Sequence, residues 1–106
     1  MSTSKKQKSE AVKFLEKVTG GSLTLARLLN SIRRSEDETL EEFSKRLGVS
    51  RQHLCDIEKE RKVVSPERAA KFAKILGYSK EQFVALALQA LVDDAELDLK
   101  VEVKAA

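Results

Sequence analysis

Residues 39–62, TLEEFSKRLGVSRQHLCDIEKERK, constrain the fold more than any other part of the chain. Thr39, followed three residues later by Glu42, has the pattern of a capping box and predicts the start of a helix. Gly48 stands where a left-handed residue would end that helix. Ser50 is placed to cap a second helix immediately afterwards. The sequence therefore predicts two short helices joined by a glycine-containing turn, which is the spacing of a helix-turn-helix.

Helical patterns also flank this pair. Capping residues and apolar spacing predict a short helix from Ser9 to the stop at Gly20-Gly21, a core helix capped by Ser22, a helix from Ser65-Pro66 to Gly77, and a last helix capped by Ser79 with Gln82. The last helix is apolar on nearly all sides, which calls for a second surface to cover it. The residues expected to face the core of these helices are Leu25, Leu28, Leu29, Ile32, Phe43, Ser44, Leu47, Leu54, Ile57, Ala69, Phe72, Ala73 and Leu76, with Val49 closing the turn.

Residues 97–104, LDLKVEVK, alternate strictly between apolar and charged side chains. A period of two is typical of a half-buried strand, and the sequence holds no other candidate for one. Because a lone strand must pair, its simplest partner is its copy in a second subunit. The expected fold is an all-α domain of five to six helices with a short C-terminal β-strand that pairs across a dimer. Residues 1–8 are expected to form a disordered tail, 9–92 the helical domain with the helix-turn-helix at 39–62, and 93–106 an acidic strand or tail for dimerisation or partner contact.

Composition limits the possible functions. A chain of 106 residues holds one small domain, and its net charge of +3 is compatible with a polyanionic partner. Five acids against two lysines make the segment after residue 92 acidic, which suggests a second surface with a different partner. With one cysteine, no signal core and no apolar run of membrane length, the expected location is cytoplasmic.

Catalytic and metal sites are not expected. The single histidine, His53, lies on a helix face that should be exposed, and no glycine-rich phosphate loop or paired carboxylates accompany it. His53 and Cys55 are two residues apart on a helix and so cannot face one another as metal ligands. The chain is therefore expected to be neither an enzyme nor a cofactor protein.

Together these features resemble the phage-repressor and xenobiotic-response-element family (Cro/repressor type) of helix-turn-helix DNA-binding domains, over about residues 22–78. The residues that carry the resemblance are Thr39, Phe43, Ser44, Leu47, Gly48, Val49, Ser50, Leu54, Ile57, Glu58 and Ser65-Pro66. Two positions depart from it. Leu40 stands where the family often has glutamine, and Glu60 stands where it commonly has glycine.

The resemblance implies sequence-specific binding of double-stranded DNA by a homodimeric transcriptional repressor, with the helix at 50–60 in the major groove. Arg51 suits guanine and Gln52 suits adenine, while Asp56 could accept from cytosine and Cys55 could contact a thymine methyl. The expected base-contacting residues are Arg51, Gln52, Cys55 and Asp56. The expected backbone-contacting residues are Thr39, Ser50, His53, Lys59, Arg61 and Lys62. The expected dimer interface comprises Phe83, Leu86, Leu91, Leu97, Leu99, Val101 and Val103.

Several alternatives stay open at this point. Asp56 could pair with a neighbouring arginine, and Glu58 is expected to make an internal hydrogen bond or ion pair. Small members of the family also serve as antitoxins, which hold a toxin protein with regions outside the motif and repress their own operon; the acidic tail and the alternating strand fit that function. A regulator that senses a small molecule is disfavoured, because little chain remains for a sensor domain.

Overall fold

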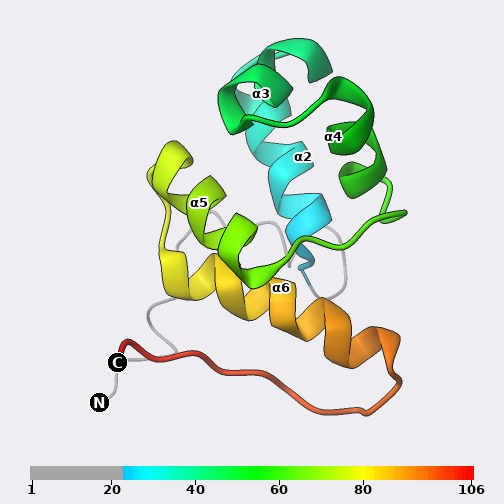
Figure 1. The fold of residues 1–106 in the computed structure, drawn as a ribbon, viewed down its shortest axis with the longest axis vertical. Coiled ribbons are helices and arrows are strands. Elements are labelled where there is room, and N and C mark those ends of the chain that lie inside the picture. Colours follow the sequence, from blue (N-terminus) through cyan, green and yellow to red (C-terminus); the bar gives the residue numbers. More distant parts are fainter. Residues whose placement is uncertain (1–22) are drawn as a thin grey trace.

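The computed structural model describes residues 23–106, which form five α-helices (Figure 1). The helices are α2 (Leu25–Ser35), α3 (Leu40–Leu47), α4 (Arg51–Glu58), α5 (Pro66–Leu76) and α6 (Lys80–Asp94). This part of the fold is all-helical, as predicted. The predicted tail at 1–8 and the predicted helix from Ser9 lie outside the described residues. Over residues 23–106, no helix combines the length and the apolar character needed to cross a bilayer.

Each described helix begins at a hydroxyl residue that accepts a hydrogen bond from the backbone N–H three residues later. The predicted caps Ser50, Ser65 and Ser79 are confirmed, and Thr39 forms the predicted reciprocal capping box with Glu42. The cap of α2 is Thr24, so the prediction of Ser22 was wrong. Thr24 acts as the cap because its hydroxyl accepts from the N–H of Arg27 at 3.1 Å, and Leu23 before it is buried.

The turn between α3 and α4 depends on the backbone of Gly48, which has φ 78° and ψ 29°. The N–H groups of Gly48 and Val49 both donate to the carbonyl of Ser44, at 2.9 and 3.0 Å. A side chain at Gly48 would meet no atom within 4 Å, so glycine is favoured here by its left-handed conformation and not by lack of space. This turn sets the angle at which α4 leaves α3.

The core lies where α2, α3 and α4 meet α5 and α6 (Figure 1). Its largest fully buried side chains are Phe43, Phe72, Phe83, Leu28, Leu29, Leu47, Leu54 and Ile57. Ser44 is the one polar residue among residues 23–106 that is buried as a whole, and its hydroxyl donates to the carbonyl of Glu41 at 2.9 Å. Phe83 packs against Tyr78 inside the chain with no exposed surface, so its predicted place in a dimer interface was wrong.

The C-terminal segment does not form the predicted β-strand within the described residues. After turns at Glu96 and Asp98, which have φ 57° and 54°, it runs back beside α6 toward the start of that helix (Figure 1). The side-chain amide of Gln89 donates to the carbonyl of Leu99 at 2.8 Å and accepts from the N–H of Val101 at 2.7 Å. A strand requires a second extended backbone, and residues 23–106 provide none, so a helix side chain takes that place.

Candidate nucleic-acid interface

Helix α4 has one face in the core and the opposite face in solvent. Leu54 and Ile57 are completely buried, whereas Arg51 and Gln52, at the leading end of the helix, are exposed. The hydroxyl of Ser50 accepts from the N–H of His53 at 3.0 Å and fixes that end. The predicted base-contacting side chains Arg51 and Gln52 are therefore presented together, on a helix whose position is set by its buried face.

The other end of α4 is held by Glu58. Its carboxylate accepts from Arg33 Nε at 2.9 Å and Nη2 at 3.0 Å, and from Asn30 Nδ2 at 2.9 Å. Arg33 also donates through Nη1 to the carbonyl of Glu38, which joins the α2–α3 loop to the same cluster. The hydrogen bond to Glu58 raises the pKa of Arg33. The expected internal ion pair of Glu58 is confirmed, and it connects α4 to α2.

Asp56 lies one turn after Gln52 and is already paired. Its Oδ1 accepts from Gln52 Nε2 at 3.0 Å and from Arg61 Nε at 3.1 Å, with Arg61 Nη2 at 3.0 Å. Burial acts to raise the pKa of Asp56, but the hydrogen bonds from Arg61 and Gln52 outweigh it and lower that pKa. The alternative in which Asp56 pairs with a neighbouring arginine is thus the arrangement found in the unbound chain, and it also engages Gln52.

The side chain of His53 on α4 reaches the first turn of α5. Its Nε2 is 3.1 Å from Nη1 of Arg68, and because a guanidinium can only donate, the imidazole must accept there in its neutral form. Burial, with Arg68 and then Lys62 nearby, lowers the pKa of His53, and Asp56 opposes this only in part. Arg68 was missed in the sequence; the available signal was a basic residue in the first turn of the helix after the motif.

The remaining predicted contacts are placed as follows. Lys59, Arg61 and Lys62 are exposed beyond the C-terminal end of α4, and Cys55 is a free thiol of intermediate exposure. The N–H of Thr39 donates to Glu42 at 2.9 Å, so this amide is occupied by a carboxylate in the unbound chain. Among residues 23–106 no group of three His, Cys, Asp or Glu side chains could hold a metal ion.

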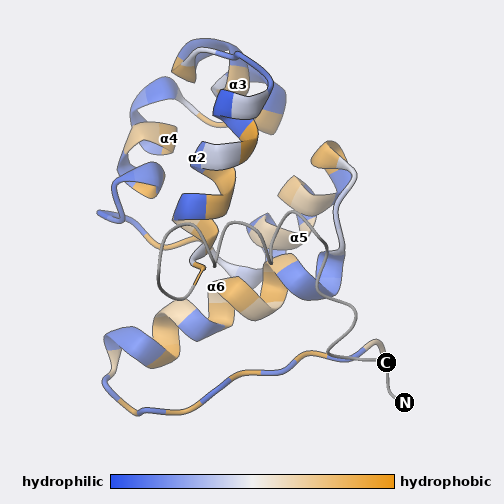
Figure 2. Cartoon of the chain, turned by 180° about the vertical axis from the view of Figure 1, so that it is seen from behind, coloured by the Kyte–Doolittle hydropathy of each residue, from blue (hydrophilic) through white to orange (hydrophobic). Residues whose placement is uncertain are grey.

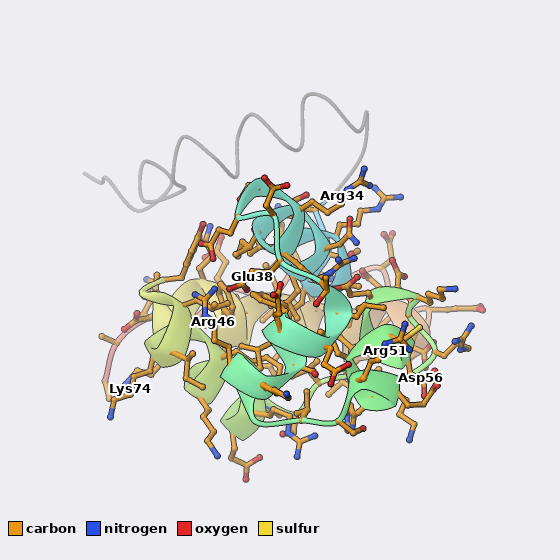
Figure 3. All side chains as sticks on the ribbon, turned by 90° about the horizontal axis from the view of Figure 1, so that it is seen from above. Arg34, Glu38, Arg46, Arg51, Asp56 and Lys74 are labelled. Atoms are coloured by element: carbon orange, nitrogen blue, oxygen red, sulfur yellow. The ribbon has the colours of Figure 1, made fainter. Side chains whose placement is uncertain are left out.

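Viewed from above, Arg51 and Asp56 lie on α4 at one edge of the molecule, while Arg46 lies beside Glu38 on the neighbouring elements (Figure 3). Arg46 Nη1 contacts Glu36 at 2.6 Å and Glu38 at 2.8 Å, and the guanidinium stacks over the ring of Phe43. The guanidinium of Arg46 is therefore paired with Glu36 and Glu38 within the chain. Arg51 is exposed, and none of the ion pairs within residues 23–106 involves it.

This geometry defines a DNA-binding helix-turn-helix domain: an anchored second helix with donors at its N-terminal end and basic side chains beyond its C-terminal end. A family model described as Helix-turn-helix matches residues 29–83, just over half of the chain. The chain belongs to this helix-turn-helix family, of the Cro/repressor type. Comparisons with curated proteins and with solved structures find no significant match.

Proposed function

We propose that the protein is a homodimeric transcriptional repressor that places the N-terminal half of α4 in the DNA major groove. The observation that carries this proposal is the exposure of Arg51 and Gln52 at the leading end of a helix whose other face is fully buried. Bases are distinguished by hydrogen bonds at their edges, and these two side chains form the best-matched bidentate pairs with guanine and adenine.

The basic residues around α4 supply the part of the DNA affinity that does not depend on the base sequence. Lys59, Lys62 and Arg68 are exposed near the ends of the helix, where backbone phosphates would lie. Arg61 is exposed too, but its guanidinium is shared with Asp56. Binding that involves several such contacts releases counterions, so the affinity should fall steeply with salt. Occupation of a promoter by this surface would block transcription.

Three alanine variants test the assignment of roles. Arg51→Ala and Gln52→Ala should each reduce discrimination between a selected site and a site changed at one base pair, by about 1–3 kcal/mol. Lys62→Ala should weaken binding to both sites alike and reduce the salt slope by about one. An equal loss on both sites from all three variants would contradict base contact by α4.

The C-terminal segment favours a second candidate function, that of an antitoxin which holds a toxin protein and represses its own operon. Leu97 and Leu99 are 55% and 60% exposed, and the surrounding segment is acidic, which suits a basic protein partner. Deletion of residues 97–106 separates the candidates. A chain that stays dimeric and binds DNA but loses a protein partner supports the antitoxin, whereas a monomer with weak DNA binding supports dimerisation by this segment.

A further inference from the structure

The backbone of the C-terminal segment is hydrogen-bonded along one edge. The carbonyl of Leu99 and the N–H of Val101 point toward α6, where Gln89 binds both. In an extended chain the backbone N–H and C=O groups of every second residue point to the same edge. The backbone groups of Lys100 and Glu102 therefore point away from the helix. Within residues 23–106 these outward groups make no backbone hydrogen bond. The segment therefore offers one open strand edge.

Apolar surface accompanies this open edge. Leu97 and Leu99 on the segment and Leu91 on α6 are three of the five large apolar side chains that are well exposed in the described chain. Figure 2 shows the segment as alternating hydrophobic and hydrophilic residues beside a largely hydrophobic α6. An exposed edge next to apolar side chains is a template for pairing with another strand.

The order of charges decides which strand fits. Along the segment they run Asp98, Lys100, Glu102, Lys104. If two copies pair antiparallel about a two-fold axis at Val101, Lys100 lies opposite the second copy's glutamate at position 102, and the reverse pair forms by symmetry. The apolar residues then also meet, Leu99 opposite valine 103 and Val101 opposite itself. Opposite charges across a strand pair stabilise it, and like charges destabilise it.

The open edge is compatible with this register. In antiparallel pairing about Val101, the hydrogen-bonded positions are the even-numbered residues, and these are the ones whose polar groups point away from Gln89. Pairing about position 100 or 102 instead places like charges opposite each other, and a parallel in-register pair does so at every charged position. Pairing about Leu99 would need Asp98 in the strand, and pairing about Val103 would leave Lys100 opposite Ala106 without a charge partner. The positive φ of Asp98 ends the extended segment there, so Asp98 and Lys104 do not pair across the strands. The charge pair that defines the register is Lys100 with Glu102.

We propose that residues 99–103 are a self-complementary dimerisation strand, whose partner is the same segment of a second copy, antiparallel and centred on Val101. The inference rests on the homodimer of the proposed function and adds its interface and register. Two segments joined in this way form a two-stranded ribbon with an α6 helix along each outer edge. The exposed side chain of Leu99 then lies beside Val103 of the second copy.

Single cysteines measure the register directly. In full-length chains that carry Cys55→Ser, Val101→Cys should form a covalent dimer under mild oxidation, because facing residues in a non-hydrogen-bonded pair have Cβ atoms about 5 Å apart. Val103→Cys is the matched control. Its copies would lie four residues apart along the strand, about 13 Å, too far for a disulfide. Cross-linking of both variants indicates parallel pairing and overturns the proposal, as does cross-linking of neither.

Charge exchange tests the pairing without a cross-link. Lys100→Glu alone and Glu102→Lys alone each place like charges opposite one another twice, and each should raise the dimer dissociation constant about tenfold. The two single variants mixed together should form a heterodimer, since each supplies the charge that the other lacks. The double exchange within one chain should restore the homodimer. Unchanged association in both single variants overturns the register.

Native mass and sedimentation read these outcomes without DNA, so they are distinct from the DNA-binding proposal. If α4 does not bind DNA, the dimer and its charge dependence persist. If the strand does not pair, a dimer indifferent to residues 100 and 102 overturns this inference alone. A purified chain that is a monomer overturns this inference and also the homodimer of the proposed function, while base contact by α4 is still measured separately. A monomer that binds a different protein through residues 97–106 would assign the segment to that protein instead.

Discussion

Arg33 on α2 and Glu58 on the last turn of α4 form a two-point ion pair, with hydrogen bonds of 2.9 Å from Nε and 3.0 Å from Nη2. Their side chains are 18% and 6% exposed, so the pair lies largely out of water. Asn30 adds a third hydrogen bond to the same carboxylate. The helix proposed to contact bases is therefore held by a charged cluster at one end and by its cap at the other.

Removing one partner of the Arg33–Glu58 pair should strongly destabilise the folded chain. Glu58→Ala leaves Nε and Nη2 of Arg33 and the amide of Asn30 without their acceptor, and should lower the free energy of unfolding by about 3–5 kcal/mol. Urea unfolding followed by circular dichroism measures the change. The matched control is Glu41→Ala, which removes an exposed ion pair with Lys45 and should cost less than about 1 kcal/mol. Equal losses in the two variants would show that the Arg33–Glu58 pair does not anchor α4.

Asp56 restrains two side chains that DNA could use. Asp56→Ala releases Gln52 and Arg61 and removes a negative charge from the proposed interface. Affinity for unrelated DNA should increase several-fold, and the salt dependence should steepen by about one phosphate contact. Fluorescence anisotropy against salt concentration, on selected and unrelated duplexes, checks both effects. Weaker binding to every duplex would instead indicate that Asp56 has a direct role in the complex.

His53 should make stability depend on pH. Its pKa is lowered from the ordinary value near 6.5, chiefly by burial and then by Arg68 and Lys62, so the folded chain favours the neutral ring. The unfolded chain then binds more protons in this range, and the contribution of His53 is complete above pH 6.5 and is lost as pH falls through the lowered value.

The matched variant His53→Gln keeps a hydrogen-bonding side chain without this titration. The difference in unfolding free energy between the parent protein and His53→Gln should decrease as the pH falls from 7.5 to 5, measured by urea unfolding at each pH. A difference that does not change with pH would mean that His53 titrates equally in both states.

Glu60 occupies a backbone conformation suited to glycine, with φ 60°. A residue with a side chain loses about 1–2 kcal/mol there, of which the greater freedom of unfolded glycine offsets part. Glu60→Gly should therefore raise the free energy of unfolding by about 0.5 kcal/mol. The reverse control is Gly48→Ala, at φ 78°, which should lower it by about 1 kcal/mol without a steric clash. A thermal unfolding midpoint that falls in both variants would contradict this account of Glu60.

Local signals in the sequence predicted much of the fold, because the determinants of a helix lie within a few residues of one another. The capping box of Thr39, the left-handed Gly48 and the cap at Ser50 all depend on neighbours. The predicted core faces follow from spacing along a helix. The glycine common in the family at position 60 also has a local meaning, since Glu60 adopts the conformation that glycine would.

Contacts between residues far apart in the chain leave no local pattern in the sequence. Arg68 meets His53 across 15 positions, and Gln89 meets the C-terminal segment across 10 and 12 positions. Phe83 was assigned to an interface because an apolar helix does not reveal which of its sides faces the core. The C-terminal alternation indicated extended backbone, but a strand is defined by its partner, and residues 23–106 do not contain one.

The central claim is that α4 contacts bases through Arg51 and Gln52. Selection of duplexes from a random pool by the full-length protein, followed by sequencing, tests it most directly when the Arg51→Ala and Gln52→Ala variants are carried in parallel. We expect the parent protein to enrich an inverted repeat with half-site centres about 10 base pairs apart, and each variant to lose preference at a different base pair of the half-site. Enrichment of the same sequence by all three proteins, or of none by the parent protein, would contradict it.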